Sequence, residues 1–201
     1  MTTTTQTIEQ EVLRIGEQAK EAAHALSRLG EEEKNRILLS MADEIDARKD
    51  DLQTANSSDL TAGREAGLSA ALLDRLELTD ARVRSMSDGI REIVTLPDPV
   101  GDVLRAWARP NGLEIEKVRV PIGVIGIIYE SRPNVTADAA ALCFKASNAV
   151  ILRGGKEARH SNHAIAETLK EGGSRAGLPT HAVQLIGTTD RDAVRVLVQM
   201  T

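Results

Sequence analysis

Three short apolar runs, separated by helical segments, place the strongest limit on how residues 120–199 can fold. The runs are GVIGIIY (123–129), AVILR (149–153) and AVQLIG (182–187). Each has the length of a strand buried on both faces, and the first two are separated by a helical segment over Thr136 to Lys145. A repeated strand–helix order predicts a parallel, doubly wound α/β sheet.

The other helices of this part complete the pattern. Ser161 to Gly172 is predicted as a helix, and residues 190–199 as another, with Thr189 or Asp190 as its N-cap. Three parallel strands are few for this architecture and leave a sheet edge to be covered. We therefore expect the sheet to be incomplete and the chain to be a truncated form of a longer protein.

Residues 1–102 have a different, mostly helical pattern. A loose polar start over residues 1–7 leads into apolar residues at helical spacing, and acidic residues open the second helix. The charged faces of the first two helices, including Lys34, are expected to be solvated. Helices are predicted over 8–29, 31–55, 59–67, 69–76 and from Thr79 to the residue before Pro97, with a break at Asn56–Ser58.

A β-hairpin is predicted over residues 103–120. Pro110-Asn111-Gly112 stands between two short runs with partial alternation, and Asn-Gly in that position is a strong hairpin signal. The second run, LEIEKVRV, does not alternate cleanly, which indicates a bulge near Glu116 and Lys117.

Composition excludes several functional classes. The net charge is −5, and the chain has one Trp, one Tyr and one Phe. A chain with no basic excess and so few aromatic rings is poorly suited to bind nucleic acid. One cysteine allows no internal disulfide, and no signal peptide or run long enough to span a bilayer is present. We expect a cytoplasmic protein with neither nucleic acid nor a membrane as its partner.

The turn RGGK follows a predicted buried strand directly. In open α/β sheets, ligands bind beyond the carboxyl ends of the strands. Gly154 and Gly155 would let the backbone approach a ligand, while Arg153 and Lys156 suit a phosphate or a nucleotide ribose. A solvated strand-to-helix turn is the alternative. The turn matches neither GxGxxG nor a Walker loop.

The segment ESRPN also follows a predicted strand. Pro133 fixes the turn, Arg132 could hold a carboxylate or phosphate with two hydrogen bonds, and Asn134 could donate its side-chain amide to a developing oxyanion. Alternatively, Asn134 caps the following helix.

Two further residue types invite a chemical role. Cys143 lies in a small-residue helix without a clear pKa-lowering pattern, which favours a buried structural thiol over a nucleophile. His160 and His163 have helical spacing but lack a third ligand, so no metal site is predicted.

These segments resemble a known family. The stretch from Val120 to Asn162, together with LDRLELTDARVRSMSDGIREIVTLPDPVG (73–101) and RPNGLEIEKVRVPIG (109–123), is similar to the gamma-glutamyl phosphate reductases, which belong to the aldehyde dehydrogenase superfamily. The resemblance begins at about Ile8 and covers only the amino-terminal half of the family's length. It implies an NADP-binding domain with helical (1–102) and Rossmann-like (121–201) parts, separated by an oligomerisation hairpin (103–120). The catalytic domain and its cysteine would be absent.

The resemblance also implies a reaction, an NADP-dependent oxidoreduction of an acyl phosphate. NADPH would reduce L-glutamate 5-phosphate to L-glutamate 5-semialdehyde, with release of phosphate, in proline biosynthesis. Implied partners are further copies of the chain and glutamate 5-kinase. The turn 153–156 corresponds to the cofactor-binding turn of the superfamily. Asn134 is preferred by residue type for the oxyanion contact, whereas ungapped counting favours Glu130, and Arg132 is assigned to the substrate.

Two other functions remain open for such a chain. One is an inactive nucleotide-binding or interaction module that pairs with a full-length protein. The other is an enzyme of the same superfamily with a different acyl substrate.

Overall fold

The computed structural model describes residues 2–200, with the side chains of the first helix described from Thr7 onward. The first part of the chain is helical, as predicted. Helix α1 begins at Thr2, so the loose start expected up to residue 7 is wrong for the backbone from Thr2 on. The five helices are α1 (Thr2–Leu26), α2 (Glu31–Ala47), α3 (Lys49–Glu65), α4 (Ala70–Leu76) and α5 (Asp80–Thr95).

The predicted break at Asn56–Ser58 is wrong. The chain breaks at Arg48 instead, and Asn56 lies inside α3. Its buried side chain donates to Leu76 O at 2.8 Å and accepts from Leu78 N at 2.8 Å. A residue that usually favours turns is held in the helix because tertiary partners satisfy its amide.

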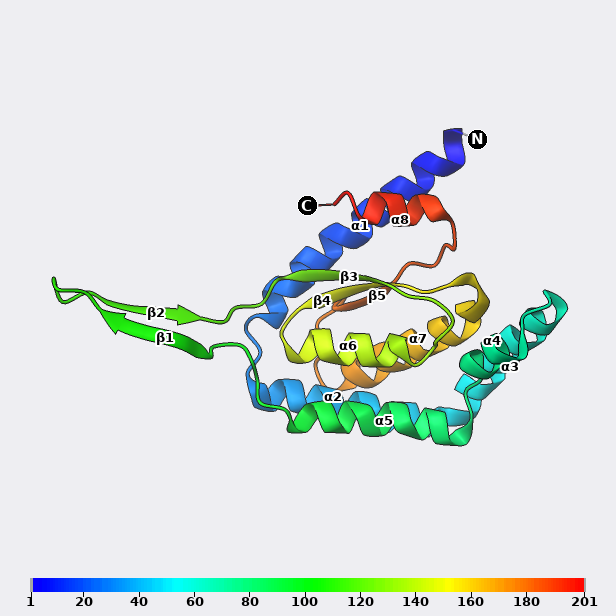
Figure 1. The fold of residues 1–201 in the computed structure, drawn as a ribbon, viewed down its shortest axis with the longest axis horizontal. Coiled ribbons are helices and arrows are strands. Elements are labelled where there is room, and N and C mark those ends of the chain that lie inside the picture. Colours follow the sequence, from blue (N-terminus) through cyan, green and yellow to red (C-terminus); the bar gives the residue numbers. More distant parts are fainter. Residues whose placement is uncertain (1, 201) are drawn as a thin grey trace.

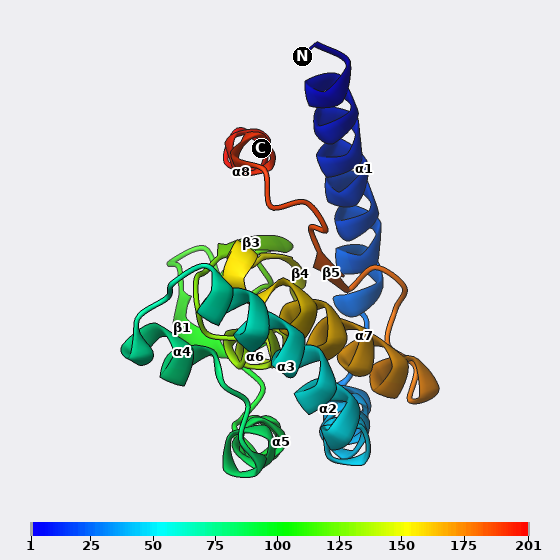
Figure 2. The ribbon, with the colours of Figure 1, turned by 90° about the vertical axis from the view of Figure 1, so that its right-hand side faces the viewer.

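Three parallel strands form the predicted sheet. β3 (Val124–Ile128), β4 (Ala149–Arg153) and β5 (Val183–Leu185) lie in the order β3-β4-β5, with β4 in the centre. Helices cover both faces, which confirms the doubly wound arrangement (Figures 1 and 2). On one face lie α1 and α8 (Arg191–Leu197), which Asp190 caps; on the other lie α6 (Val135–Lys145) and α7 (Arg159–Arg175), preceded by the 3₁₀ turn η1 (Lys156–Ala158).

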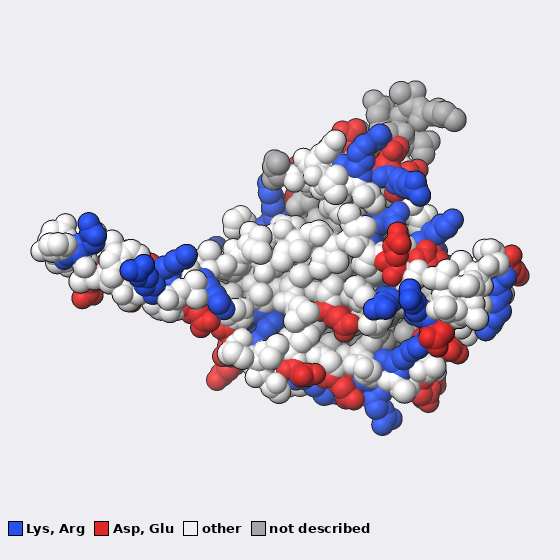
Figure 3. Space-filling view, in the orientation of Figure 1, with Lys and Arg blue, Asp and Glu red and all other residues white. Residues whose placement is uncertain are grey.

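The strand β3 is not buried on both faces as expected. It is an edge strand, and Ile128 is 45% exposed, whereas Ala149 to Leu152 of β4 are all buried. An apolar run therefore identified both strands but could not distinguish a central strand from an edge strand. The surface over β3 and α6 carries few charges (Figure 3).

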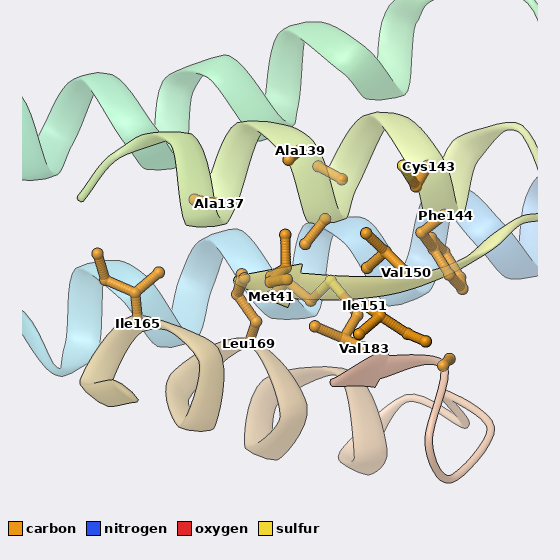
Figure 4. Close-up of a cluster of buried hydrophobic side chains, with 14 of the residues drawn as sticks. Met41, Ala137, Ala139, Cys143, Phe144, Val150, Ile151, Ile165, Leu169 and Val183 are labelled. Atoms are coloured by element: carbon orange, nitrogen blue, oxygen red, sulfur yellow. The ribbon is translucent and has the colours of Figure 1, made fainter. Parts of the chain in front are cut away.

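The core lies between the sheet and the helices on its two faces. The small residues of α6, such as Ala137 and Ala140, are fully buried and let this helix pack closely on β4. Phe144, Val150, Ile151, Leu169 and Met41 fill the space between the sheet, α6, α7 and α2 (Figure 4). The helices α2 and α5 form a further layer beneath α6 and α7 (Figures 1 and 2).

The predicted hairpin is present and projects away from the rest of the molecule (Figure 1). It consists of β1 (Val103–Ala108) paired antiparallel with β2 (Glu114–Val118). The bulge is in β1, not in β2 as predicted: Val103 faces Val118 and Arg105 faces Lys117, so Leu104 is the extra residue. Lysine and arginine side chains line the hairpin (Figure 3).

Lys34 contradicts the expectation of a solvated charged face on α2. Its side chain is fully buried, forms an ion pair with Asp98, and donates to Lys145 O at 3.2 Å and Ser147 Oγ at 3.0 Å. The ammonium group is thus satisfied by the connector that leads into the hairpin and by the turn between α6 and β4.

Candidate functional site: two clefts beside the carboxyl ends of the strands

The first cleft lies where β4 and β5 end. We name it the β4–β5 cleft; its volume is about 340 Å³, within the range of small-molecule sites. It is lined by Gly154, Gly155, Arg159, His160, Asn162, His163, Leu185, Ile186, Gly187 and Thr189. The predicted turn thus contributes both glycines to a cleft at the expected end of the sheet.

Both glycines of the turn are also required by their neighbours. A Cβ on Gly154 would overlap Asn162 Nδ2 and lie 3.2 Å from Tyr129 Cζ, and a Cβ on Gly155 would overlap the Glu157 carboxylate. Close approach of protein side chains is therefore a reason for Gly-Gly at this turn.

The two cations of the turn have different surroundings. Arg153 is half-buried, and its guanidinium donates to Gly154 O at 3.1 Å and Thr189 O at 2.7 Å, which ties β4 to the loop after β5. Its Nε is buried without a hydrogen-bond partner among the described residues. Lys156 is exposed in η1, and neither it nor Arg153 is part of the cleft lining.

Sequence reasoning missed Asp59. This buried carboxylate of α3 accepts hydrogen bonds from His160 N (3.1 Å), Ser161 N (2.8 Å) and Ser161 Oγ (2.6 Å) at the start of α7. Two amide donors that a phosphate could use in other α/β folds are therefore already occupied. The partners are about a hundred positions apart in the chain, and no local pattern signals the contact.

The second cleft lies between α5 and α6, and we name it the α5–α6 cleft. Its volume is about 460 Å³. It brings together the predicted site residues Arg132 and Asn134, with a strongly charged lining: Asp74, Arg75, Glu77, Leu78, Arg82, Ser85, Met86, Arg132, Pro133, Asn134 and Asp138. Glu130, the positional alternative to Asn134, is not part of this lining.

Asn134 occupies the N-cap position of α6, as the alternative predicted, but its side chain makes no capping hydrogen bond. Its backbone is helical, and its Nδ2 donates to Asp138 Oδ2 at 3.0 Å. One N–H of the amide is used in this bond, and the other remains for a ligand. Burial raises the pKa of Asp138, and the hydrogen bond from Asn134 acts in the opposite direction.

A carboxylate connects the two predicted loops. Glu157 Oε1 accepts from Ser131 N at 2.8 Å and Ser131 Oγ at 2.7 Å, and Ser131 has a left-handed φ of 50°. Burial opposes the charge on Glu157, but the hydrogen bonds from Ser131 and its own backbone, together with Lys156, outweigh this and lower its pKa. The ESRPN loop and the RGGK turn are thus held as one unit.

A second, buried connection runs beneath these loops. Tyr129 Oη lies 2.6 Å from Thr136 Oγ1, which donates to Asn162 Oδ1 at 3.1 Å. Burial raises the pKa of Tyr129 to about 12, and the bond with Thr136 acts against this, so the phenol is neutral and structural at pH 7. The end of β3, the start of α6 and the start of α7 share this network.

Cys143 is buried in the core, as predicted (Figure 4). Burial raises the pKa of its thiol to about 11, so little thiolate exists at neutral pH. His160 and His163 both line the β4–β5 cleft. Within residues 2–200, no group of three or more His, Cys, Asp or Glu side chains is placed to hold a metal ion.

Comparison with known proteins identifies the class. The sequence profile of the aldehyde dehydrogenase family matches residues 1–201, and the chain belongs to this family. The fold agrees: a probable aldehyde dehydrogenase from Listeria monocytogenes, only 17% identical, superposes with a TM-score of 0.75 over 98% of this chain and 40% of that one.

Individual relatives point to one enzyme within the family. The gamma-glutamyl phosphate reductases of Mesorhizobium japonicum and Moorella thermoacetica are 59% and 54% identical, over 90% and 94% of this chain. The crystal structure of that reductase from Thermotoga maritima is 39% identical, with a TM-score of 0.92 over 94% of this chain and 46% of that one. The chain spans 42% and 45% of the lengths of the two curated relatives.

Proposed function

We propose that this chain forms the cofactor-binding part of a gamma-glutamyl phosphate reductase. The complete enzyme would reduce L-glutamate 5-phosphate to L-glutamate 5-semialdehyde with NADPH and release phosphate, a step of proline biosynthesis. The observation that carries the proposal is the 59% identity to the Mesorhizobium reductase, and it is supported by the two clefts beside the carboxyl ends of the strands.

The β4–β5 cleft fits one end of NADP(H). The backbone of Gly154 and Gly155 forms part of its wall, and the exposed Lys156 of the same turn, just outside the lining, would supply a cation for a ribose phosphate. Arg153 would act mainly by holding the wall in place, because its guanidinium is already bonded to Gly154 O and Thr189 O. The cofactor would supply the hydride when bound.

The ESRPN loop fits the reacting end of the substrate. One amide N–H of Asn134 donates to Asp138, which fixes the orientation of the amide. The second N–H would donate to the acyl oxygen of the substrate, on which negative charge develops during the reaction. The exposed Arg132 would bind the phosphate of the acyl phosphate. Cys143 is not the nucleophile, because it is buried in the core and its pKa is raised.

We further propose a cytoplasmic homo-oligomer assembled through the hairpin. Its strands are exposed almost throughout and carry apolar side chains, among them Leu104 (50% exposed) and Trp107 (36%). An acyl phosphate hydrolyses readily, so glutamate 5-kinase is the expected supplier. No described helix has the length and apolarity needed to cross a membrane.

A chimaera tests the proposed reaction. Residues 1–201 are joined to the remaining carboxyl-terminal part of the Mesorhizobium relative, and oxidation of glutamate 5-semialdehyde is followed at 340 nm with NADP⁺ and phosphate. We expect phosphate-dependent turnover by the chimaera and none by the 201-residue chain. A folded chimaera that oxidises other aldehydes but not this one would refute the substrate assignment.

A further inference from the structure

Asp138 is the one charged residue of the α5–α6 cleft that is both half-buried and without an opposite charge among the described residues. Asp74 pairs with Arg82, whose guanidinium also donates to Glu77 O. Arg75, Glu77 and Arg132 are exposed and hydrated. A carboxylate withdrawn from water without a cation is costly, so its place beside an open cleft calls for a partner.

The two oxygens of Asp138 have different environments. Oδ2 accepts from Asn134 Nδ2, whereas Oδ1 has no hydrogen bond from any described residue. Oδ1 faces α5, where it would lie 3.9 Å from a Cβ on Gly89. The absence of a side chain on Gly89 keeps this side of Oδ1 free of a covering group, and Asp138 itself lines the cleft.

The spacing along α6 fits one substrate. Asn134 and Asp138 are one helical turn apart and both line the cleft, and because their side chains are joined by a 3.0 Å hydrogen bond, the free N–H of Asn134 and Oδ1 of Asp138 lie within reach of one short chain. In a glutamyl group, four bonds separate the γ-carbonyl carbon from the α-nitrogen, roughly 5 Å when extended. A glutamyl chain whose acyl oxygen lies at Asn134 can therefore place its ammonium group beside Asp138.

We propose that Asp138 binds the α-ammonium group of the substrate and thereby selects an amino acid over a plain dicarboxylic acid derivative. The identity of the ligand rests on the proposed function above. The assignment gives the α5–α6 cleft a specificity-determining residue distinct from Asn134 and Arg132, which act at the acyl phosphate.

Two stable probes differing in one group test the proposal. L-Glutamate and glutarate share the carbon chain and both carboxylates, but only L-glutamate has the ammonium group. Each is titrated into the ¹⁵N-labelled 201-residue chain, and amide shifts of residues 131–138 and 82–90 are followed. A charge-assisted hydrogen bond predicts about tenfold tighter binding of L-glutamate.

Three variants test whether the carboxylate of Asp138 causes the preference for L-glutamate over glutarate. Asp138→Asn keeps an oxygen for the bond from Asn134 and should abolish the tenfold preference, whereas Asp138→Glu, which restores the charge, should recover part of it. Asp88→Asn removes a carboxylate from α5 outside the cleft lining and should leave the preference unchanged. Absence of L-glutamate shifts at the cleft in the original chain, or a preference that survives Asp138→Asn, overturns the proposal.

The chimaera distinguishes this failure from failure of the proposed function. If it oxidises glutamate 5-semialdehyde while Asp138→Asn leaves the preference for the ammonium group intact, only the role of Asp138 is wrong. If it is folded and inactive while the chain still binds L-glutamate through Asp138, the reaction is wrong and the amino-acid site remains.

Discussion

Gly154 and Gly187 line the same cleft but have different neighbours. A Cβ on Gly154 would overlap Asn162 Nδ2, whereas one on Gly187 would meet no atom within 4 Å. Asn162 is buried and bonded to Thr136, so it cannot move away without breaking that bond.

Alanine at these two positions should therefore have unequal effects. We expect Gly154→Ala to lower the free energy of unfolding by about 1–3 kcal/mol through overpacking. Gly187→Ala should change it by less than about 0.5 kcal/mol. Urea denaturation followed by circular dichroism measures both, and equal effects would show that Gly154 is not constrained by Asn162.

Asp138 should make stability depend on pH. Its pKa in the folded chain is raised by burial above the ordinary value of 3.8, so the folded state binds the proton more tightly than the unfolded state. The free energy of unfolding therefore falls as pH rises from the unfolded-state pKa of this carboxyl, 3.8, through its higher folded-state pKa. Asp138→Asn should raise the Tm at pH 7 and lose this advantage below about pH 4. A lower Tm for the variant at pH 7 would contradict the unpaired carboxylate.

Single residues were predictable where a local pattern carried the signal. The burial of Cys143 followed from its small-residue helix, and a cap at Thr189 or Asp190 from their position before a helical run; the cap is Asp190. The buried contacts of Asp59 and Lys34 were not predictable from the sequence. The partners of Asp59 on α7, and Ser147, a partner of Lys34, lie about a hundred or more positions further along the chain. Asp98, which pairs with Lys34, is separated from it by several helices.

At the scale of elements, periodicity located most helices and all strands. It failed where polar side chains found distant partners, as with Asn56 inside α3. It also could not show that β3 is an edge strand, because sheet order depends on packing and not on the run itself. The two loops were predicted as candidate sites, but the hydrogen bonds that join them through Ser131 and Glu157 were not.

The buried pair of Lys34 and Asp98 fixes α2 against the connector before the hairpin. Removing Lys34 leaves the largely buried Asp98 carboxylate, whose side chain is 15% exposed, without its cation, so Lys34→Met should cost about 3–5 kcal/mol of unfolding free energy. Lys49→Met, which removes an exposed pair with Asp80, should cost less than about 1 kcal/mol. Denaturant titrations of both variants provide the comparison; a Lys34→Met cost no larger than that of Lys49→Met would show that the buried pair adds no stability.

At the scale of the whole molecule, the hairpin carries the only tryptophan of the chain, Trp107. It is 36% exposed, with Arg105 stacked 5.2 Å from the centre of its ring. If the hairpin forms the oligomer contact, dilution should shift the tryptophan emission to longer wavelength together with a fall in mass by light scattering. A fall in mass with unchanged emission would place the contact elsewhere.

The central claim is that the β4–β5 cleft of this chain binds the reducing cofactor, and an NADPH titration of the ¹⁵N-labelled chain tests it most directly. We expect saturable amide shifts at residues 153–163 and 185–189, with binding weakened about tenfold by Lys156→Ala. Lys170→Ala, which replaces a half-buried lysine of α7 paired with Glu167 and outside the cleft lining, is the control and should bind NADPH as the original chain does. Shifts that do not involve this cleft, or an NADPH affinity unchanged by Lys156→Ala, would contradict the assignment.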